Sequence, residues 1–544
     1  MTSSDRNDDR ADGQGMFSTR SLSRRERKAL YAPVKATQRS SKPRSQQVDP
    51  GPGPMGWARP GGGRTLKVSQ TPEFRAPTVQ VCGMYPFGVG SSLALIGTPL
   101  GPHLEGRGMV CGDPVSYFAE GLINNPSAFC LARPGTGKST LLRHIAGYLP
   151  AKGVLPIVLS DWKPDYVDLV KRLEGQVIKL GRASGFVNPL DPGPLGKRLT
   201  DLPEDVRARV RANMRGRRSN VMEGLCALAL GSDLVAHERS VLSRAMEVWD
   251  NDNPDRVPVV HDILRIIEGR QPALRRFAGD HGDNARYDER VQRLVDALNA
   301  LDGGSETFGR VFAEPTSTDL HLDRAVVFDL SEFEEMDPIL QAGVQLVCWS
   351  YGSTAVSGAK ALADAGLAPR RTYLLIMDEL WRALRAAPFM VDRVDEITRM
   401  NRTLGLGQLL CTHGMDDLKV HDDQATAKAW GFVSRSEIVY LGGLNPGEMG
   451  NLEEVFALSR TEKDLLTSWA EGGQVNPVTG EKAPPRGRGK FLFKVGKKAG
   501  VPFKLDLLDV ETGVHDTNRA WADQIEAMQR AGADDVDDLD SATY

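Results

Sequence analysis

The sequence predicts an α/β protein with a mostly parallel central sheet and an all-helical insertion. Short apolar runs recur along the chain with helical stretches between them, and these runs are 128–131, 155–159, 325–328, 373–377, 409–411 and 438–441. Continuously apolar strands that alternate with helices indicate a parallel sheet that is covered on both faces. A last pair of runs, 491–495 and 503–508, is expected to be antiparallel.

Residues 197–305 interrupt this alternation. Apolar side chains recur there at spacings of three and four residues, as in Val241, Leu242, Ala245 and Val248, and no strong strand pattern is present. We therefore expect this stretch to be an insertion of helices between two strands of the sheet.

Composition divides the rest of the chain into segments. Residues 1–64 are rich in Arg, Ser, Gly and Pro and offer little apolar surface, so we expect a disordered basic tail. Within this tail, Ser21–Leu30 is either simply solvated or a short basic helix that contacts anionic lipid or nucleic acid. The expected order of the remaining parts is a small strand-rich region (65–125), an α/β core (126–196 and 306–510) around the insertion (197–305), and a C-terminal helix with an acidic tail (511–544). In the strand-rich region the expected strands are Val79–Val81 and Leu93–Ile96.

Charge and hydropathy exclude several classes of protein. The 544 residues include 68 Lys and Arg against 71 Asp and Glu, and a net charge of −3 does not favour nucleic acid or a membrane surface as a partner of the whole chain. The sequence has no run of 18 apolar residues and no secretory signal pattern, so we expect a cytoplasmic protein without a transmembrane segment. The six scattered cysteines form no C-x-x-C pair and are expected to be buried free thiols.

The strongest chemical signal is the segment 132–140, Ala-Arg-Pro-Gly-Thr-Gly-Lys-Ser-Thr. It follows an apolar run and opens a helical stretch, which is the context that a Walker A phosphate-binding loop requires. Backbone N–H groups and the helix start would hold the phosphates of ATP, Lys138 would reach the β- and γ-phosphates, and Ser139 would reach Mg²⁺. The motif departs from its usual pattern at Ala132, where a glycine is expected. The residues expected to bind the nucleotide are Arg133, Pro134, Gly135, Thr136, Gly137, Lys138, Ser139 and Thr140.

The second signal is the apolar run Thr372–Met377, which ends in Asp378 and Glu379. A buried strand that ends in two acids is the Walker B pattern. Asp378 is expected to hold Mg²⁺ through water, and Glu379 to orient and deprotonate the attacking water. This pattern is weak alone, since any strand can end in acids, but together with the Walker A loop it predicts a nucleotide hydrolase.

A third group of polar residues follows the apolar run 155–159. It consists of Asp161–Tyr166 and, further on, Asn188–Asp191. On their own these residues are typical of turns without a catalytic duty. In their order, however, the motifs resemble those of the ATPase domain of TraC/TrbE-like conjugation ATPases, the large ATPases of type IV secretion within the HerA/FtsK superfamily. The resemblance covers about residues 110–510 and includes the family's Asp-Glu-x-Trp at Asp378–Trp381, whereas Asp165 stands where the family has Glu.

The resemblance implies a RecA-like P-loop fold and two further site residues. In the family, a helix after Walker B delivers an arginine toward the nucleotide of the neighbouring subunit. Arg402 matches that position, with Arg399 as the runner-up, and the alternative is a solvated helix arginine. A phosphate-sensing Gln after the next strand is replaced here by His413, which is either a sensor or a structural histidine. An arginine that acts between subunits implies a ring, by resemblance a hexamer.

The function implied by the resemblance is ATP hydrolysis, with ATP and Mg²⁺, that energises conjugative DNA transfer or type IV secretion. The expected partners are further copies of the chain and proteins of the membrane secretion machinery, which would hold it peripherally at the inner face of the cell membrane; DNA is a further candidate. Two alternatives stay open, namely a DNA-translocating motor or coupling protein of the HerA/FtsK kind and a nucleotide-binding scaffold with little turnover. A basic channel would favour the motor, whereas Ala132 and His413 favour the scaffold.

Overall fold

The computed structural model describes residues 94–511, apart from 107, 183–184, 387–389, 393–394, 396–404, 421 and 474–484. Contacts divide the chain into two units, Met1–Gly88 and Val89–Tyr544, and every described residue belongs to the second. The expected basic tail, residues 65–93 of the expected strand-rich region and the acidic tail lie outside the described residues. Arg399 and Arg402 lie outside them as well.

A nine-stranded sheet forms the centre of the described chain, in the order β11-β10-β9-β3-β8-β7-β4-β6-β5. The strands from β9 to β5 in this order are parallel to their neighbours, whereas β10 pairs antiparallel with both β9 and β11. This topology confirms the mostly parallel α/β fold. The bounds are β3 (Ser127–Leu131), β4 (Val154–Asp161), β5 (Gln176–Lys179), β6 (Val326–Asp329), β7 (Thr372–Met377), β8 (Leu406–Thr412), β9 (Ile438–Leu441), β10 (Lys490–Val495) and β11 (Val501–Lys504).

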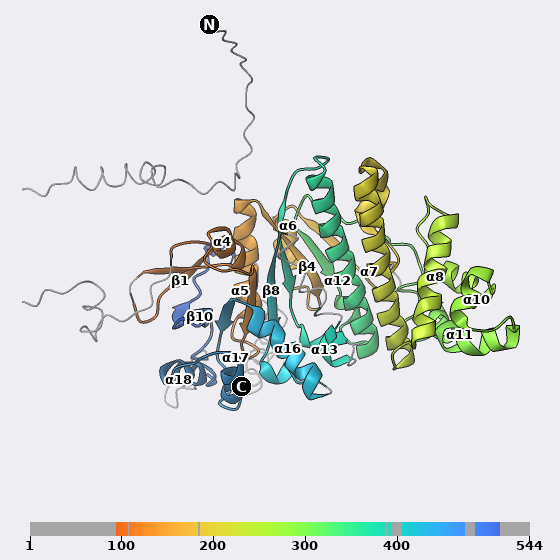
Figure 1. Cartoon of the computed structure of the whole chain (residues 1–544). Helices are drawn as coiled ribbons and strands as arrows, with labels where there is room; N and C mark the ends of the chain where they lie inside the picture. Colours follow the sequence, from red (N-terminus) through yellow and green to blue (C-terminus); the bar gives the residue numbers. More distant parts are fainter. Residues whose placement is uncertain are drawn as a thin grey trace, which may run out of the picture. The chain divides into compact units, whose positions relative to one another are not determined.

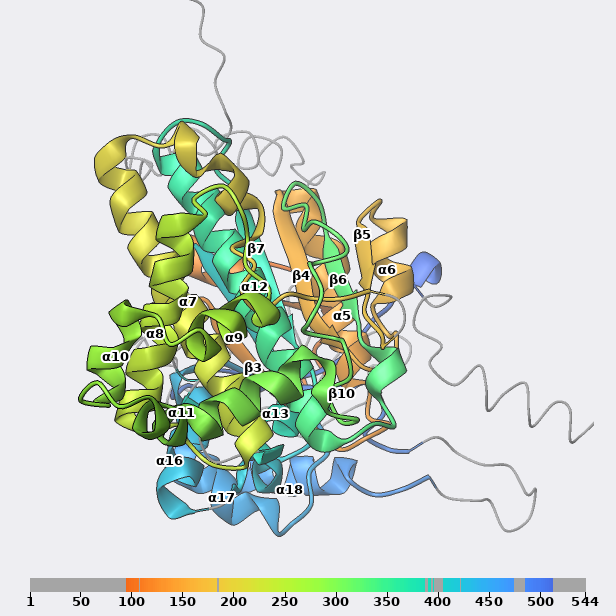
Figure 2. The same ribbon diagram turned by 90° about the vertical axis from the view of Figure 1, so that its right-hand side faces the viewer.

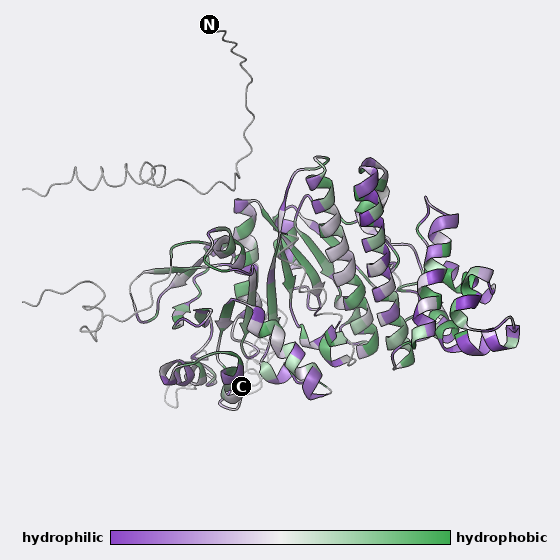
Figure 3. Cartoon of the chain, viewed as in Figure 1, coloured by the Kyte–Doolittle hydropathy of each residue, from purple (hydrophilic) through white to green (hydrophobic). Residues whose placement is uncertain are grey.

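Both faces of the sheet are covered by helices (Figures 1 and 2). Because successive side chains of a strand point to opposite faces, Phe129 and Leu131 join one apolar cluster while Ala128 and Cys130 join the other. Figure 3 shows the strands mostly in the colour of apolar residues, in contrast to the polar outer helices. The first cluster includes side chains of α12 (Pro338–Asp364), α13 (Trp381–Ala386), α16 (Asp423–Arg435), α17 (Glu448–Val455) and α18 (Arg460–Trp469), and the second those of α4 (Pro114–Ala119), α5 (Lys138–Tyr148) and α6 (Val167–Arg172).

Five α-helices lie between β5 and β6 in the described part of the chain. They are α7 (Glu204–Leu230), α8 (Ala236–Asp252), α9 (Val260–Glu268), α10 (Pro272–Ala278) and α11 (Asn284–Asn299). The helical spacing expected from sequence is reflected in burial, since Val241, Leu242 and Ala245 are all fully buried. The long helix α7 runs beside α12 and so connects these helices to one face of the sheet (Figure 1).

The described residues before β3 form a small hairpin rather than the strand that was expected over Leu93–Ile96. Residues 94–96 are not in a strand, and Leu95 is 74% exposed, so its apolar character does not reflect a place in a sheet. Gly97 turns the chain at a φ of +92°, a left-handed conformation. The antiparallel pair begins only after it, as β1 (Pro99–Pro102) and β2 (Met109–Cys111).

The described residues contain neither a helix that could span a membrane nor a disulfide bond. None of their helices is both long and apolar enough to cross a membrane. The five cysteines that the structure describes, at positions 111, 130, 226, 348 and 411, are buried and free.

Candidate functional site

The residues singled out by the motifs gather at the carboxyl ends of the central strands of the sheet. Strands β3, β8, β7 and β4 are neighbours in this order and run parallel, so their carboxyl ends meet. The Walker A loop follows β3, Asp378 and Glu379 follow β7, and His413 follows β8. The turn that begins with Asp161 follows β4. Ligands of open α/β sheets bind outside the carboxyl ends of the strands, which is where this site lies.

The Walker A loop has the backbone of a phosphate cradle. Gly135 and Gly137 have φ values of +77° and +103°, in the region that glycine adopts without strain. Gly137 precedes α5, whose first residue is Lys138. The start of α5 leaves backbone N–H groups without intrahelical partners and carries the positive end of the helix dipole, which favours an anion at the loop.

Ala132, the departure from the usual motif, fits because of a glycine opposite it. The backbone N–H of Gly442, just after β9, donates to the carbonyl of Leu131, and the N–H of Arg133 donates to the carbonyl of Gly443. A methyl group placed on Gly442 would lie 2.5 Å from Cβ of Ala132. The side chain that the loop gained at 132 thus uses space that is left open at 442, and Ala132 itself is fully buried.

Two oxygen ligands suited to Mg²⁺ face each other across the site. The hydroxyl of Ser139 lies 3.3 Å from a carboxylate oxygen of Asp378, and the hydroxyl of Tyr166 donates to the same oxygen at 3.0 Å. Burial raises the pKa of the neighbouring Asp165, which Arg143 opposes. Hydroxyl and carboxylate oxygens are the donors that Mg²⁺ takes in nucleotide sites. The residues present therefore fit the ion expected from sequence.

The turn after β4 places Tyr166 against Asp378. The carboxylate of Asp161 accepts from the backbone N–H groups of Asp165 and Tyr166, at 2.9 and 2.8 Å, and so closes the turn. Burial raises the pKa of Asp161 to about 7, although these two donors act against the rise. Arg143 of α5 donates to the carbonyls of Ser139 and Asp165, which connects the turn to the Walker A helix. The segment forms a turn, as its residue types predict, and it also places the hydroxyl of Tyr166 in the site.

His413 bridges the two motifs. Its Nδ1 lies 2.6 Å from Nζ of Lys138, and its Nε2 lies 3.2 Å from a carboxylate oxygen of Glu379. An ammonium group can only donate, so Nδ1 must accept and the ring proton must reside on Nε2. In this arrangement Nε2 donates to the carboxylate of Glu379.

Glu379 is held in a strained and specific position. Its φ of +53° lies in the left-handed region, which a residue with a long side chain adopts at an energetic cost and which is frequent at functional sites. The indole N–H of Trp381 donates to the carboxylate oxygen that also faces His413. Burial would raise the pKa of Glu379, but hydrogen bonds from His413 and Trp381 lower it to about 2. The group is therefore an ionised carboxylate at neutral pH.

A comparison with solved structures identifies the fold. VirB4 of Thermoanaerobacter pseudethanolicus matches with a TM-score of 0.56 and 17% sequence identity, over 76% of this chain and 98% of that one. The chain shares its fold with VirB4. The plasmid coupling protein TrwB, in a complex with ADP and Mg²⁺, matches with a TM-score of 0.40 and 12% identity, over 71% of this chain and 86% of that one. Comparisons with protein-family models and with curated sequences found no match.

The VirB4-like fold thus brings together most of the residues expected from the motifs. Lys138 and Ser139 lie at the carboxyl ends of the strands, together with Asp378 and Glu379. Arg402 lies outside the described residues. The sequence alone indicates no role for Tyr166, Arg143 or Trp381. Tyr166 and Trp381 were part of the motifs that carry the family resemblance, but no spacing indicated which oxygen each of them contacts.

Proposed function

We propose that the protein is a Mg²⁺-dependent ATP hydrolase. The observation that carries the proposal is the approach of Ser139 to Asp378, because it joins the Walker A loop and the Walker B strand in one site with the phosphate cradle beside it. Glu379 follows directly, and its carboxylate is ionised and oriented by two hydrogen bonds. The VirB4-like fold supports this reading.

In the proposed mechanism the loop Arg133–Thr140 holds the phosphates through its backbone N–H groups. Lys138 contributes a positive charge at the β- and γ-phosphates, while Ser139 and Asp378 would hold Mg²⁺. When bound, this ion would neutralise charge on the phosphate oxygens. Glu379 orients the attacking water and takes its proton, and water then attacks the γ-phosphate in line with the leaving oxygen.

We assign His413 the role of a sensor that couples the two motifs. Lys138, the lysine expected to contact phosphate, donates to Nδ1 of His413. When ATP takes up the donors of Lys138, Nδ1 of His413 loses this partner, and its other nitrogen still contacts Glu379. The occupancy of the phosphate site is thereby transmitted to the hydrolytic base. This reading favours the sensor over the purely structural histidine.

The biological role proposed is the energising of conjugative DNA transfer or type IV secretion. The resemblance to TraC/TrbE-like ATPases and the VirB4-like fold support it. The same resemblance supports a hexameric ring completed by Arg402, docked on secretion-machinery proteins at the inner face of the cell membrane, with DNA as a further candidate partner.

Two other functions are distinguished by one assay. ATP turnover of the full chain is measured with Mg²⁺, with and without single- and double-stranded DNA, alongside nucleotide affinity. Turnover that does not require DNA supports the secretion ATPase. Turnover that appears only with DNA would favour a translocating motor of the HerA/FtsK kind, and tight binding without turnover would favour a nucleotide-binding scaffold.

A further inference from the structure

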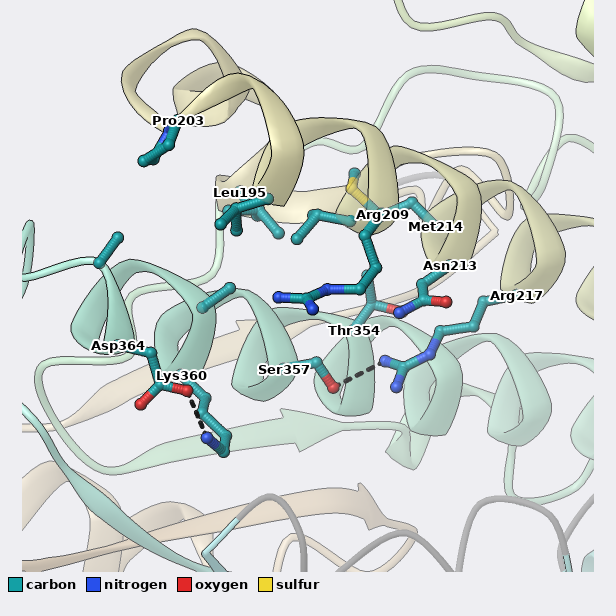
Figure 4. A pocket seen from close by; sticks show the side chains of 14 residues that line it. Leu195, Pro203, Arg209, Asn213, Met214, Arg217, Thr354, Ser357, Lys360 and Asp364 are labelled. Atoms are coloured by element: carbon teal, nitrogen blue, oxygen red, sulfur yellow. Dashed lines mark hydrogen bonds and ion pairs between the residues drawn. The ribbon is translucent and has the colours of Figure 1, made fainter.

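A groove lies between α7 and α12, away from the nucleotide site (Figure 4). It has a volume of about 600 Å³, and none of the residues that line it belongs to the Walker motifs. The side formed by α7 and the segment before it is largely aliphatic, with Leu195, Val206 and Val210, whereas α12 contributes Ala361 beside polar side chains such as Ser357. The groove is therefore a place where an apolar segment loses contact with water.

The groove is also basic. Arg217 donates to the hydroxyl of Ser357 at 2.8 Å, and Lys360 is paired with Asp364. Arg209 is exposed and extends from α7 toward α12 across the opening. Among the described residues, no hydrogen bond or ion pair holds the guanidinium of Arg209. A cation without a partner at the mouth of an apolar groove favours an occupant that carries both apolar and acidic side chains.

The charge of α7 is concentrated where it borders the groove. Residues 206–218 contain six arginines and no acidic residue, in a chain whose net charge is −3. The last residues of the sequence carry a concentration of negative charge. Five aspartates there are interspersed with two aliphatic residues, namely Asp534, Asp535, Asp537, Asp538 and Asp540 with Val536 and Leu539. This pattern of acids and aliphatic residues is complementary to the cations and aliphatic walls of the groove.

We propose that the acidic segment 531–544 of this chain docks in the groove between α7 and α12. Its aspartates would contact Arg209 and its neighbours, while Val536 and Leu539 would enter the apolar part. Residues 512–530 connect the segment to the last described residue, Glu511, and, at about 3.3 Å each, span up to roughly 60 Å. A compact domain of about 420 residues has a radius of gyration of roughly 22 Å, so the connection is long enough. The proposal does not depend on the proposed ATPase activity.

The groove is less suited to nucleic acid. Single-stranded DNA and RNA bind on aromatic side chains that stack with the bases, and no aromatic residue is among those that line the groove. Its cations could contact phosphates, but the aliphatic side chains of the groove would then stay exposed to water. An acidic peptide with aliphatic side chains satisfies both the walls and the cations.

A cross-linking experiment on the full chain tests the proposal. A photo-reactive amino acid replaces Leu539, and mass spectrometry locates the cross-links after illumination at low salt. We expect them on α7 and α12 around the groove, and we expect their yield to fall when the five aspartates are changed to Asn. Arg209→Glu should lower the yield roughly fivefold or more, since it replaces an attraction with a repulsion.

The matched control is Arg211→Glu. Arg211 is also an exposed arginine of α7 but does not line the groove, so its reversal should leave the yield nearly unchanged. Equal thermal unfolding of the variants shows that each one folds. Cross-links elsewhere, or an equal loss with Arg209→Glu and Arg211→Glu, would overturn the proposal. So would an oligonucleotide that binds the full chain and is weakened by Arg209→Glu while the tail cross-links outside the groove.

Discussion

The ammonium group of Lys138 lies 2.6 Å from Nδ1 of His413. Because the ammonium can only donate, this contact determines the tautomer of the ring and directs the Nε2 proton toward Glu379, 3.2 Å away. A lysine of the phosphate cradle and the candidate hydrolytic base are thus connected through one imidazole. The first prediction concerns this connection.

Replacing His413 with Ala should lower kcat by on the order of 10²-fold, because Glu379 loses a donor that orients it. The KM for ATP should change less, since Lys138 and the backbone of the loop remain. His413→Gln is the matched variant: a carboxamide oxygen can accept from Lys138 and its NH₂ can donate to Glu379, so most of the activity should return. Steady-state kinetics measure both parameters. If Gln is as damaging as Ala in a folded protein, the bridge has no role in turnover.

Replacing Tyr166 with Phe should weaken Mg²⁺ binding. The hydroxyl of Tyr166 donates to Asp378, and loss of such an outer partner lowers metal affinity by roughly tenfold. The Mg²⁺ concentration required for half-maximal turnover measures the effect. Tyr148→Phe is the control, since Tyr148 is the last residue of α5, at the opposite end of the helix from Lys138. An unchanged Mg²⁺ requirement in Tyr166→Phe would exclude this role for the turn after β4.

Gly442→Ala should destabilise the Walker A loop. The new methyl group would lie 2.5 Å from Cβ of Ala132, and such overpacking costs about 1–3 kcal/mol. We expect lower thermal stability and weaker nucleotide binding, whereas the control Gly450→Ala has open space around the added methyl group. The double variant Ala132→Gly with Gly442→Ala should recover most of the loss, because it moves the single methyl group to the other side of the contact. Additive losses in the double variant would show that the two positions do not share this space.

The proposed trans-acting role of Arg402 predicts complementation between subunits. Arg402→Ala should impair hydrolysis, by on the order of 10³-fold, while nucleotide binding stays nearly intact. Mixing these subunits with Lys138→Ala subunits should restore part of the activity, since some interfaces then pair an intact loop with an intact arginine. ATP turnover of co-assembled rings measures it. No recovery in rings shown to contain both variants would exclude the role.

The fold was largely predictable from the sequence because most strands are buried on both faces. Runs such as 373–377 and 128–131 are continuously apolar for that reason, and β7 and β3 contain them. The edge strand β5, Gln-Val-Ile-Lys, was missed because it is short and only partly buried. The opposite error occurred near Leu95, where apolar residues predicted a strand that the structure does not contain, because these residues are not buried in a sheet.

The site was predictable only in part. The spacing of the motifs located Lys138 and Glu379 at strand ends, but their catalytic roles remain predictions. The contact of Tyr166 with Asp378 joins residues 212 positions apart, and that of Lys138 with His413 joins residues 275 apart. Such pairs depend on the order of strands in the sheet, which the sequence does not state. The fit of Ala132 against Gly442 likewise depends on the pairing of β3 with β9.

The central claim is that Lys138 and Glu379 divide the work of binding and hydrolysing ATP. The measurement that tests it most directly is steady-state ATP turnover of Glu379→Gln, taken together with its affinity for ATP and compared with Lys138→Ala. We predict that Glu379→Gln keeps ATP bound while turnover falls by on the order of 10²-fold or more, and that Lys138→Ala loses tight binding. Turnover in Glu379→Gln equal to that of the native chain would contradict the account.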